Sequence, residues 1–206
     1  SASLWRTPKC LSWKVMTTEI GEPFPGGYHL RSMVHSEESR LHEIDRQAAG
    51  LFKTIAVADI AAIADRPSMP LAQFVAMLSG CTVIVACHRQ VLAVGFIAAD
   101  RLGDDLFVRE LSVAPDHGRR GVGSALLRAI ISHGRQNALR ACLLSTFRDV
   151  AFNAPFYRKH GFAELPLADA SPAIRQRFEE DIPAGIRPGL RLLMINMLDQ
   201  DSSNRD

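Results

Sequence analysis

Runs rich in valine, isoleucine, leucine and phenylalanine recur along the chain, each bounded by glycine, proline or polar residues, and such runs predict β-strands. Seven strands are expected, at residues 28–34, 82–87, 91–99, 106–114, 141–146, a short segment opening at 162, and 190–198. The three strands between 82 and 114 follow one another across short turns, one of them at 101–104. That spacing favours an antiparallel meander.

Apolar residues spaced three and four apart predict helices in the intervening segments. The first helix begins after Ser36, an N-cap candidate, and places Leu41, Ile44 and Ala48 on one face over about four turns. Further helices are expected at 57–64, 70–79, from Val122 to about Arg135, at 153–160 and at 173–180. The pattern predicts a single α/β domain with a mixed central sheet of about seven strands and flanking helices.

The two ends of the chain differ from this domain in composition. Residues 1–18 carry three basic residues and no acid, and they lack the continuous apolar run of a secretory signal. We therefore expect residues 1–26 to be a leader that takes no part in the chemistry, 27–200 to form the domain, and 201–206 to be a polar tail.

Composition narrows the class of protein. The 206 residues are 47% hydrophobic and 22% charged with a net charge of +2, as expected for a globular chain that buries a sizeable core. No apolar stretch approaches the roughly 20 residues needed to cross a bilayer. Four cysteines form no C-x-x-C pair, and three lie in apolar stretches. Free thiols in a reducing cytoplasm, with no membrane partner, are the expectation.

The most distinctive stretch, HGRRGVGS at 117–124, stands between a predicted strand and the strongest predicted helix. Glycines allow an anion to approach the unpaired N–H groups of a helix N-terminus. The segment from Pro115 to Arg140 contains five arginines and only one acidic residue, so its local charge also favours an anion. A strand-to-helix turn with a solvated basic face remains the alternative. The stretch lacks both the Gly-Lys-Ser/Thr ending of nucleotide hydrolases and the third glycine of dinucleotide-binding loops.

Residues 111–127, LSVAPDHGRRGVGSALL, resemble the central motif of the GNAT acyltransferases, and NAPFYRKHGF at 153–162 resembles their second motif. The resemblance implies a splayed parallel strand pair that binds acetyl-CoA. The chain departs from the family pattern at two positions. Gly118 occupies a position where the family commonly has arginine or glutamine. Val150 occupies the position of the family's asparagine, and the asparagine of this chain is three residues later, at Asn153. The implied CoA-binding residues are the backbone of Leu111, Ser112 and Val113 for pantetheine, and Arg119, Arg120, Gly121, Val122, Gly123 and Ser124 for the pyrophosphate.

Two residues are candidates for the proton transfers of acetyl transfer to an amine. Glu110 lies in a strand with apolar residues on both faces, where a carboxylate is costly unless it is used, and its neighbour Arg109 should point to the opposite face. It is the candidate general base, with a structural salt bridge as the alternative. The resemblance implies that Tyr157 is the general acid; otherwise it is a packed aromatic. Asn153 is an N-cap, a pantetheine contact, or both.

The sequence thus predicts an N-acetyltransferase that moves the acetyl group of acetyl-CoA directly to a primary amine of a small molecule or peptide. The segments 36–79 and 166–189 are expected to build the acceptor site. Acidic residues of the first helix could attract a cation, although a solvated face is the simpler interpretation: Glu37, Glu38, Glu43 and Asp45. A non-catalytic acyl-CoA sensor on the same fold is the alternative function, and a homodimer is left open.

Other chemistries fit less well. His35, Glu38 and His42 share a helix face, but nothing supplies further ligands, so no metal site is expected. Cys142 lies in an apolar strand without an adjacent histidine, which argues against a cysteine nucleophile. The small net charge and only two tyrosines argue against nucleic acid as a partner.

Overall fold

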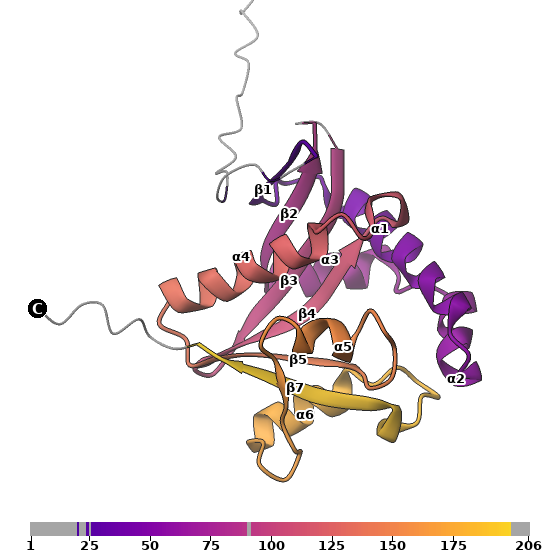
Figure 1. The fold of residues 1–206 in the computed structure, drawn as a ribbon, viewed down its shortest axis with the longest axis vertical. Coiled ribbons are helices and arrows are strands. Elements are labelled where there is room, and N and C mark those ends of the chain that lie inside the picture. The colour runs from indigo at the N-terminus through magenta and orange to yellow at the C-terminus, as the bar shows by residue number, and fades with distance from the viewer. Residues whose placement is uncertain (1–19, 21–23, 25, 90–91, 199–206) are drawn as a thin grey trace, which may run out of the picture.

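The computed structural model describes residues 20, 24, 26–89 and 92–198. Seven strands form one sheet in the order β1-β2-β3-β4-β5-β7-β6, in which only the β4–β5 pair is parallel (Figure 1). This arrangement confirms the expected mixed sheet and its central meander. The strands are β1 (Tyr28–Ser32), β2 (Thr82–His88), β3 (Leu92–Leu102), β4 (Asp105–Val113), β5 (Ala141–Phe147), β6 (Ala163–Glu164) and β7 (Arg191–Met197).

Helices cover both faces of the sheet. They are α1 (Glu38–Ala49), α2 (Ala58–Ala61), α3 (Leu71–Ser79), α4 (Val122–Gln136), α5 (Ala154–Arg158) and α6 (Pro172–Glu180). Figure 1 shows α4 lying across the sheet on the face opposite α3. The side chains of α1 and α3 form a second core on the other face of β2 and β3, and α6 packs beside it against β4, β5 and β7.

The apolar stripe of α4 explains its position. Leu126, Leu127 and Ile130 are fully buried against the sheet, and each such side chain contributes about 1.5–3 kcal/mol of transfer free energy. The long helix is therefore firmly placed, and its N-terminus is held at the end of β4.

The parallel strands β4 and β5 pair over only three residues each, Leu106–Val108 with Cys142–Leu144. Beyond these pairs the strands separate, while β4 stays paired to β3 as far as Val113 and β5 stays paired to β7 as far as Phe147. The splayed parallel pair implied by the family resemblance is therefore present.

Some expected boundaries were wrong. Ser36 does not cap the first helix: it has a φ of 81°, and Glu37 occupies the N-cap position. The Glu37 carboxylate instead accepts the N–H of Val34 and pairs with Arg31. The predicted four-turn helix ends at Ala49 and continues as a 3-10 helix, and α5 is shorter than the 153–160 segment predicted for it.

The expected leader lies mostly outside the described residues, as do the 201–206 tail and Cys10, so these remain predictions. Three residues of the leader range, 20, 24 and 26, are described, and two of them contact β1. The Ile20 N–H donates to the Leu30 carbonyl at 2.8 Å, and the Phe24 ring stacks on Tyr28 with centroids 5.4 Å apart. Within the described ranges, none of the helices has the length and apolar character that crossing a membrane requires.

Candidate active site

The loop between β4 and α4 presents its backbone to solvent. A short 3-10 helix, Pro115–His117, leads into Gly118, and Gly121 takes the left-handed conformation, with a φ of 82°, as the N-cap of α4. Among the described residues, the N–H groups from Arg119 to Ser124 find no hydrogen-bond acceptor. Together with the positive end of the helix dipole they form a site suited to a polyphosphate.

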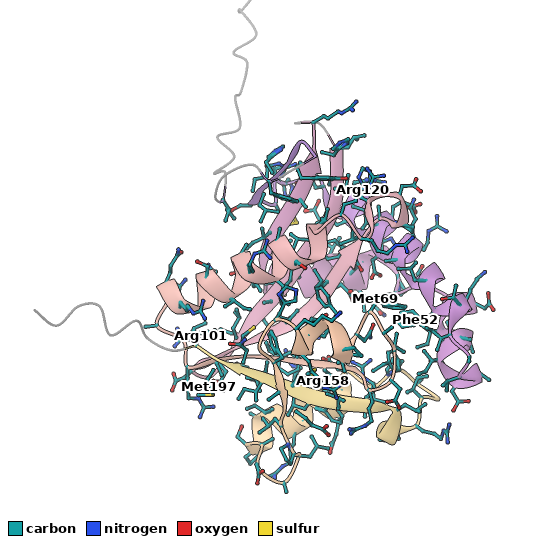
Figure 2. The ribbon with its side chains drawn as sticks, viewed as in Figure 1. Phe52, Met69, Arg101, Arg120, Arg158 and Met197 are labelled. Atoms are coloured by element: carbon teal, nitrogen blue, oxygen red, sulfur yellow. The ribbon has the colours of Figure 1, made fainter. Side chains whose placement is uncertain are left out.

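The side chains of this loop add to the site in different ways. Arg119 and Arg120 are exposed, and Figure 2 shows Arg120 at the edge of the molecule, near the end of the sheet where α4 begins. The Ser124 hydroxyl lies 3.0 Å from Nε2 of His160, so the first turn of α4 contacts the segment that follows α5. His160 was not singled out in the sequence, because the contact joins two segments that are distant along the chain.

The open edge of β4 suits an extended ligand. Beyond Val108 none of the described strands pairs with the β5-facing side of β4, although Leu111, Ser112 and Val113 remain fixed by β3 on the other side. An extended chain bearing amides can add to such an edge through backbone hydrogen bonds. Asn153 lies at the N-cap position of α5, where the sequence analysis expected a capping residue. Its side chain makes no capping hydrogen bond to any described residue.

Glu110 lies where β4 leaves β5. Its carboxylate accepts hydrogen bonds from the Ser112 hydroxyl and the Leu111 N–H, both at 3.0 Å. Burial raises the pKa of Glu110 to about 8, and the negative charge of Asp45 adds to the rise, while the two hydrogen bonds oppose it. In the described part of the chain Glu110 has no ion-pair partner within 4 Å. The salt-bridge alternative therefore finds no support.

Arg109 was expected to point away from Glu110 because strand residues alternate. The alternation fails here, because a β-bulge makes Glu110 pair with Ala98 and Val108 with Ala99, which leaves Arg109 extra. Arg109 nevertheless does not neutralise Glu110. Its guanidinium lies 3.1 Å from Asp100 and 3.7 Å from Asp181.

Tyr157 belongs to α5 and packs against the core on the α4 side of the sheet. Its ring packs on Phe156 and Phe162, with centroids 5.2 and 5.8 Å away, and the side chain is only half-buried. Burial raises the pKa of Tyr157 above its ordinary value, and the negative charge of Glu110 raises it further. The phenol therefore stays protonated at neutral pH and lies within electrostatic reach of the glutamate.

Two charged residues beside Glu110 were missed or undervalued in the sequence. Asp45 of α1 lies 3.2 Å from the Ser112 hydroxyl. Arg191, the first residue of β7, donates to the Ser145 hydroxyl at 2.7 and 3.1 Å, and Glu110 is among the groups that perturb it. The available signal for Asp45 was its position one turn after the buried Leu41; Arg191 had none, because only strand pairing brings it here.

The other acidic residues of α1 and its N-cap are engaged elsewhere. Glu43 pairs with Arg46 on the same helix, and Glu37 pairs with Arg31. His35 and Glu38 are 3.6 Å apart, but the described residues contain no group of three or more side chains that could hold a metal ion. Asp45 is thus the acid of this helix that faces Glu110.

Comparison with known proteins bears on the family and the fold. A family model described as an acetyltransferase (GNAT) domain matches residues 79–164, which include the loop, Glu110 and Tyr157. The ribosomal-protein-S18-alanine N-acetyltransferase of Escherichia coli superposes with a TM-score of 0.60 at 13% identity, covering 87% of this chain and 99% of that one.

Two further solved structures share the fold. A GNAT-family acetyltransferase from Staphylococcus aureus Mu50 has a TM-score of 0.61 and 18% identity, with coverage of 84% of this chain and 99% of that chain. The PaiA N-acetyltransferase of Thermoplasma acidophilum, solved with coenzyme A, has a TM-score of 0.59 and 17% identity, with coverage of 82% and 98%. The matched segment and the shared fold agree: residues 79–164 are similar to the GNAT acetyltransferase domain, and the chain has the fold of GNAT N-acetyltransferases.

Proposed function

We propose that this protein transfers the acetyl group of acetyl-CoA to a primary amine of a small molecule or peptide, with both substrates bound together. The observation that carries the proposal is that Glu110, where β4 leaves β5, and Tyr157 lie within electrostatic reach of each other. One is a carboxylate whose pKa of about 8 suits a general base, and the other is a phenol that stays protonated.

The residues present fit acetyl-CoA. The unpaired N–H groups from Arg119 to Ser124 would hold its pyrophosphate, and the free edge of Leu111–Val113 would hold the pantetheine amides. Bound in this way, the thioester supplies an activated acyl carbon. Asn153, at the N-cap position of α5, is proposed to contact the same arm.

The proton transfers balance between the two residues. Glu110 takes one proton from the ammonium ion, which frees the nitrogen lone pair to form the bond to the acyl carbon. Tyr157 gives its proton to the sulfur as the carbon–sulfur bond breaks, and the second proton lost by the nitrogen restores the phenol. An amine with a pKa near 10 arrives protonated at neutral pH, so the transfer needs the base.

Three segments surround the acceptor side of Glu110. Asp45 comes from α1, Asp181 follows α6, and Arg191 opens β7. The aromatic ring of Phe52, at the end of the first helical segment, contacts Phe147 and Phe152 with centroids 5.5 Å away in each case; Phe52 is labelled in Figure 2. We propose, as the sequence predicts, that segments 36–79 and 166–189 build the acceptor site.

The test is thioester consumption with acetyl-CoA against amines, amino acids, polyamines, aminoglycosides and peptides, with the product identified by mass spectrometry. The wild type is compared with Tyr157→Phe, and with Glu43→Gln as a control that removes a carboxylate away from the site. The proposal predicts turnover of at least one amine, lost in Tyr157→Phe and kept in Glu43→Gln. Tight acetyl-CoA binding without turnover of any acceptor would favour the acyl-CoA sensor instead.

A further inference from the structure

Glu110 is one half of a pair of acids. The Ser112 hydroxyl lies 3.0 Å from Oε1 of Glu110 and 3.2 Å from Oδ1 of Asp45. Ser112 is buried at 4% exposure, so water does not replace it as the bridge. A hydroxyl has a single proton to donate and therefore serves one of the two carboxylates at a time.

Several charged or titratable groups face this pair from the elements packed around it. His42, one turn before Asp45 on α1, donates Nε2–H to the Met69 carbonyl at 2.6 Å. Arg191 approaches Glu110 from β7, and Tyr157 approaches it from α5. Arg191 is itself engaged by Ser145 and faces Asp181, so it only partly offsets the negative charge.

The two carboxylates cannot both be ionised cheaply. Burial raises the pKa of Asp45 as well as that of Glu110. Two buried carboxylates within hydrogen-bond distance of the same hydroxyl hold one proton between them at neutral pH, as coupled acids do. In the absence of a bound amine, the pair therefore carries a single negative charge.

We infer that Asp45, acting through the Ser112 hydroxyl, is the second acid of the acceptor site, where it attracts the amine as an ammonium ion and prepares Glu110 to receive the proton. This inference rests on the proposed function. Asp45 is a positioning residue for the transfer, and it makes the preferred acceptor a cation at the moment of binding.

The proton balance of the cycle supports this role. The positive charge of the bound ammonium favours two ionised carboxylates, so the shared proton leaves to solvent when the acceptor binds. Glu110 then takes a proton from the nitrogen, and the Ser112 hydroxyl turns to Asp45, which is now the remaining charged acid. The neutral amide faces a pair that again holds one proton, and one proton in total has been released.

The experiment compares Asp45→Asn and Ser112→Ala with Glu43→Gln, which removes a carboxylate from the same helix while leaving the pair intact. The pH dependence of kcat/KM and the separate values of kcat and KM are measured with an amine that the wild type acetylates. In the Asp45→Asn variant, the acidic limb of the kcat/KM pH profile should shift to lower pH by about one unit or more, because the variant removes a like charge beside Glu110. The same variant should raise KM for the amine at least tenfold.

Ser112→Ala should move the limb in the opposite direction, because ionised Glu110 loses a hydrogen-bond donor. Glu43→Gln should leave the limb and KM unchanged. Loss of activity in Asp45→Asn with an unmoved limb and unchanged KM would overturn the inference and leave Asp45 a merely structural residue.

A second readout separates this inference from the proposed function. The carboxyl carbon of Glu110 is followed by ¹³C NMR in protein labelled with ¹³Cδ-glutamate, and its signal is identified by its absence in Glu110→Gln. The titration midpoint of Glu110 should fall in Asp45→Asn, with no substrate present. If the wild type acetylates an amine but the Glu110 midpoint is unchanged in Asp45→Asn, the inference about Asp45 is overturned and the proposed function stands. If the midpoint falls in Asp45→Asn but the wild type acetylates no amine, the coupling of the two acids stands and the proposed function is overturned.

Discussion

Two glycines at the start of α4, Gly121 at its N-cap and Gly123 in its first turn, should respond to substitution by alanine in opposite ways. Gly121 has a φ of 82°, and a Cβ built on it meets no described atom within 4 Å, so its cost is conformational and not steric. An L-residue held in the left-handed region costs about 1–2 kcal/mol. Gly121→Ala should therefore lower the free energy of unfolding by that amount, which lowers the Tm of a chain of this length by about 2–8 °C.

Gly123 is the matched control, two residues further on and inside the first turn of α4. Its φ is not positive, and an added Cβ would lie 3.7 Å from Phe156 and 3.9 Å from Val113, which are ordinary contacts. Because alanine is the better helix former by up to about 1 kcal/mol, Gly123→Ala should be neutral or stabilising.

The assay is urea unfolding of both variants together with calorimetric titration of coenzyme A. If the backbone of Gly121→Ala relaxes toward negative φ at the substituted position, the N–H groups that follow it turn away from the anion, and affinity should fall about tenfold or more for each charge-assisted hydrogen bond lost. Gly123→Ala should bind coenzyme A like the wild type. Equal stability of the two variants, or unaltered binding by a destabilised Gly121→Ala, would refute the reasoning about this loop.

Three further expectations follow from the same structure. The kcat/KM for acetyl transfer should rise with pH through an apparent pKa near 8, because only the ionised form of Glu110 accepts a proton; a rate independent of pH between 6 and 9 contradicts this assignment. Asp105→Ala should cost about 1.5–3 kcal/mol in urea unfolding, since the buried Asp105 accepts bonds of 2.6 and 2.9 Å from Arg140, and a change under 0.5 kcal/mol would show that the pair contributes little. Gly95→Ala should destabilise by about 1–3 kcal/mol and weaken coenzyme A binding, because its Cβ would lie 3.0 Å from the Ser112 carbonyl oxygen; unchanged calorimetric affinity would show that β4 had not moved.

The sequence was most informative where structure depends on local pattern. The alternation of apolar runs identified all seven strands, and the glycine-rich stretch located the start of α4 at Val122. Both are short-range signals, because strand patterning and helix starts depend on neighbouring residues. Ser36 shows the limit of such signals: it is a suitable N-cap residue, but the Arg31–Glu37 pair gives that position to Glu37.

The surroundings of Glu110 could not be predicted in the same way. The bulge at Arg109 changes which residues share a face of β4, and no glycine or proline near it in β4 would have predicted the bulge from the sequence. Asp45 and Arg191 are separated from Glu110 by 65 and 81 positions, and they meet it because α1 packs on β4 while β7 pairs with β5. Contacts between side chains from three distant elements produce no periodic pattern in the sequence, so sequence periodicity could not predict them.

The role of Glu110 as the general base is the central claim, and the rate of acetyl transfer by Glu110→Gln tests it most directly. Glutamine keeps the size of the side chain and removes its ability to take a proton. The account predicts that kcat/KM at pH 8 falls by about 10²–10⁴ while the affinity for acetyl-CoA is unchanged. A variant that retains wild-type turnover with the same acceptor would contradict it.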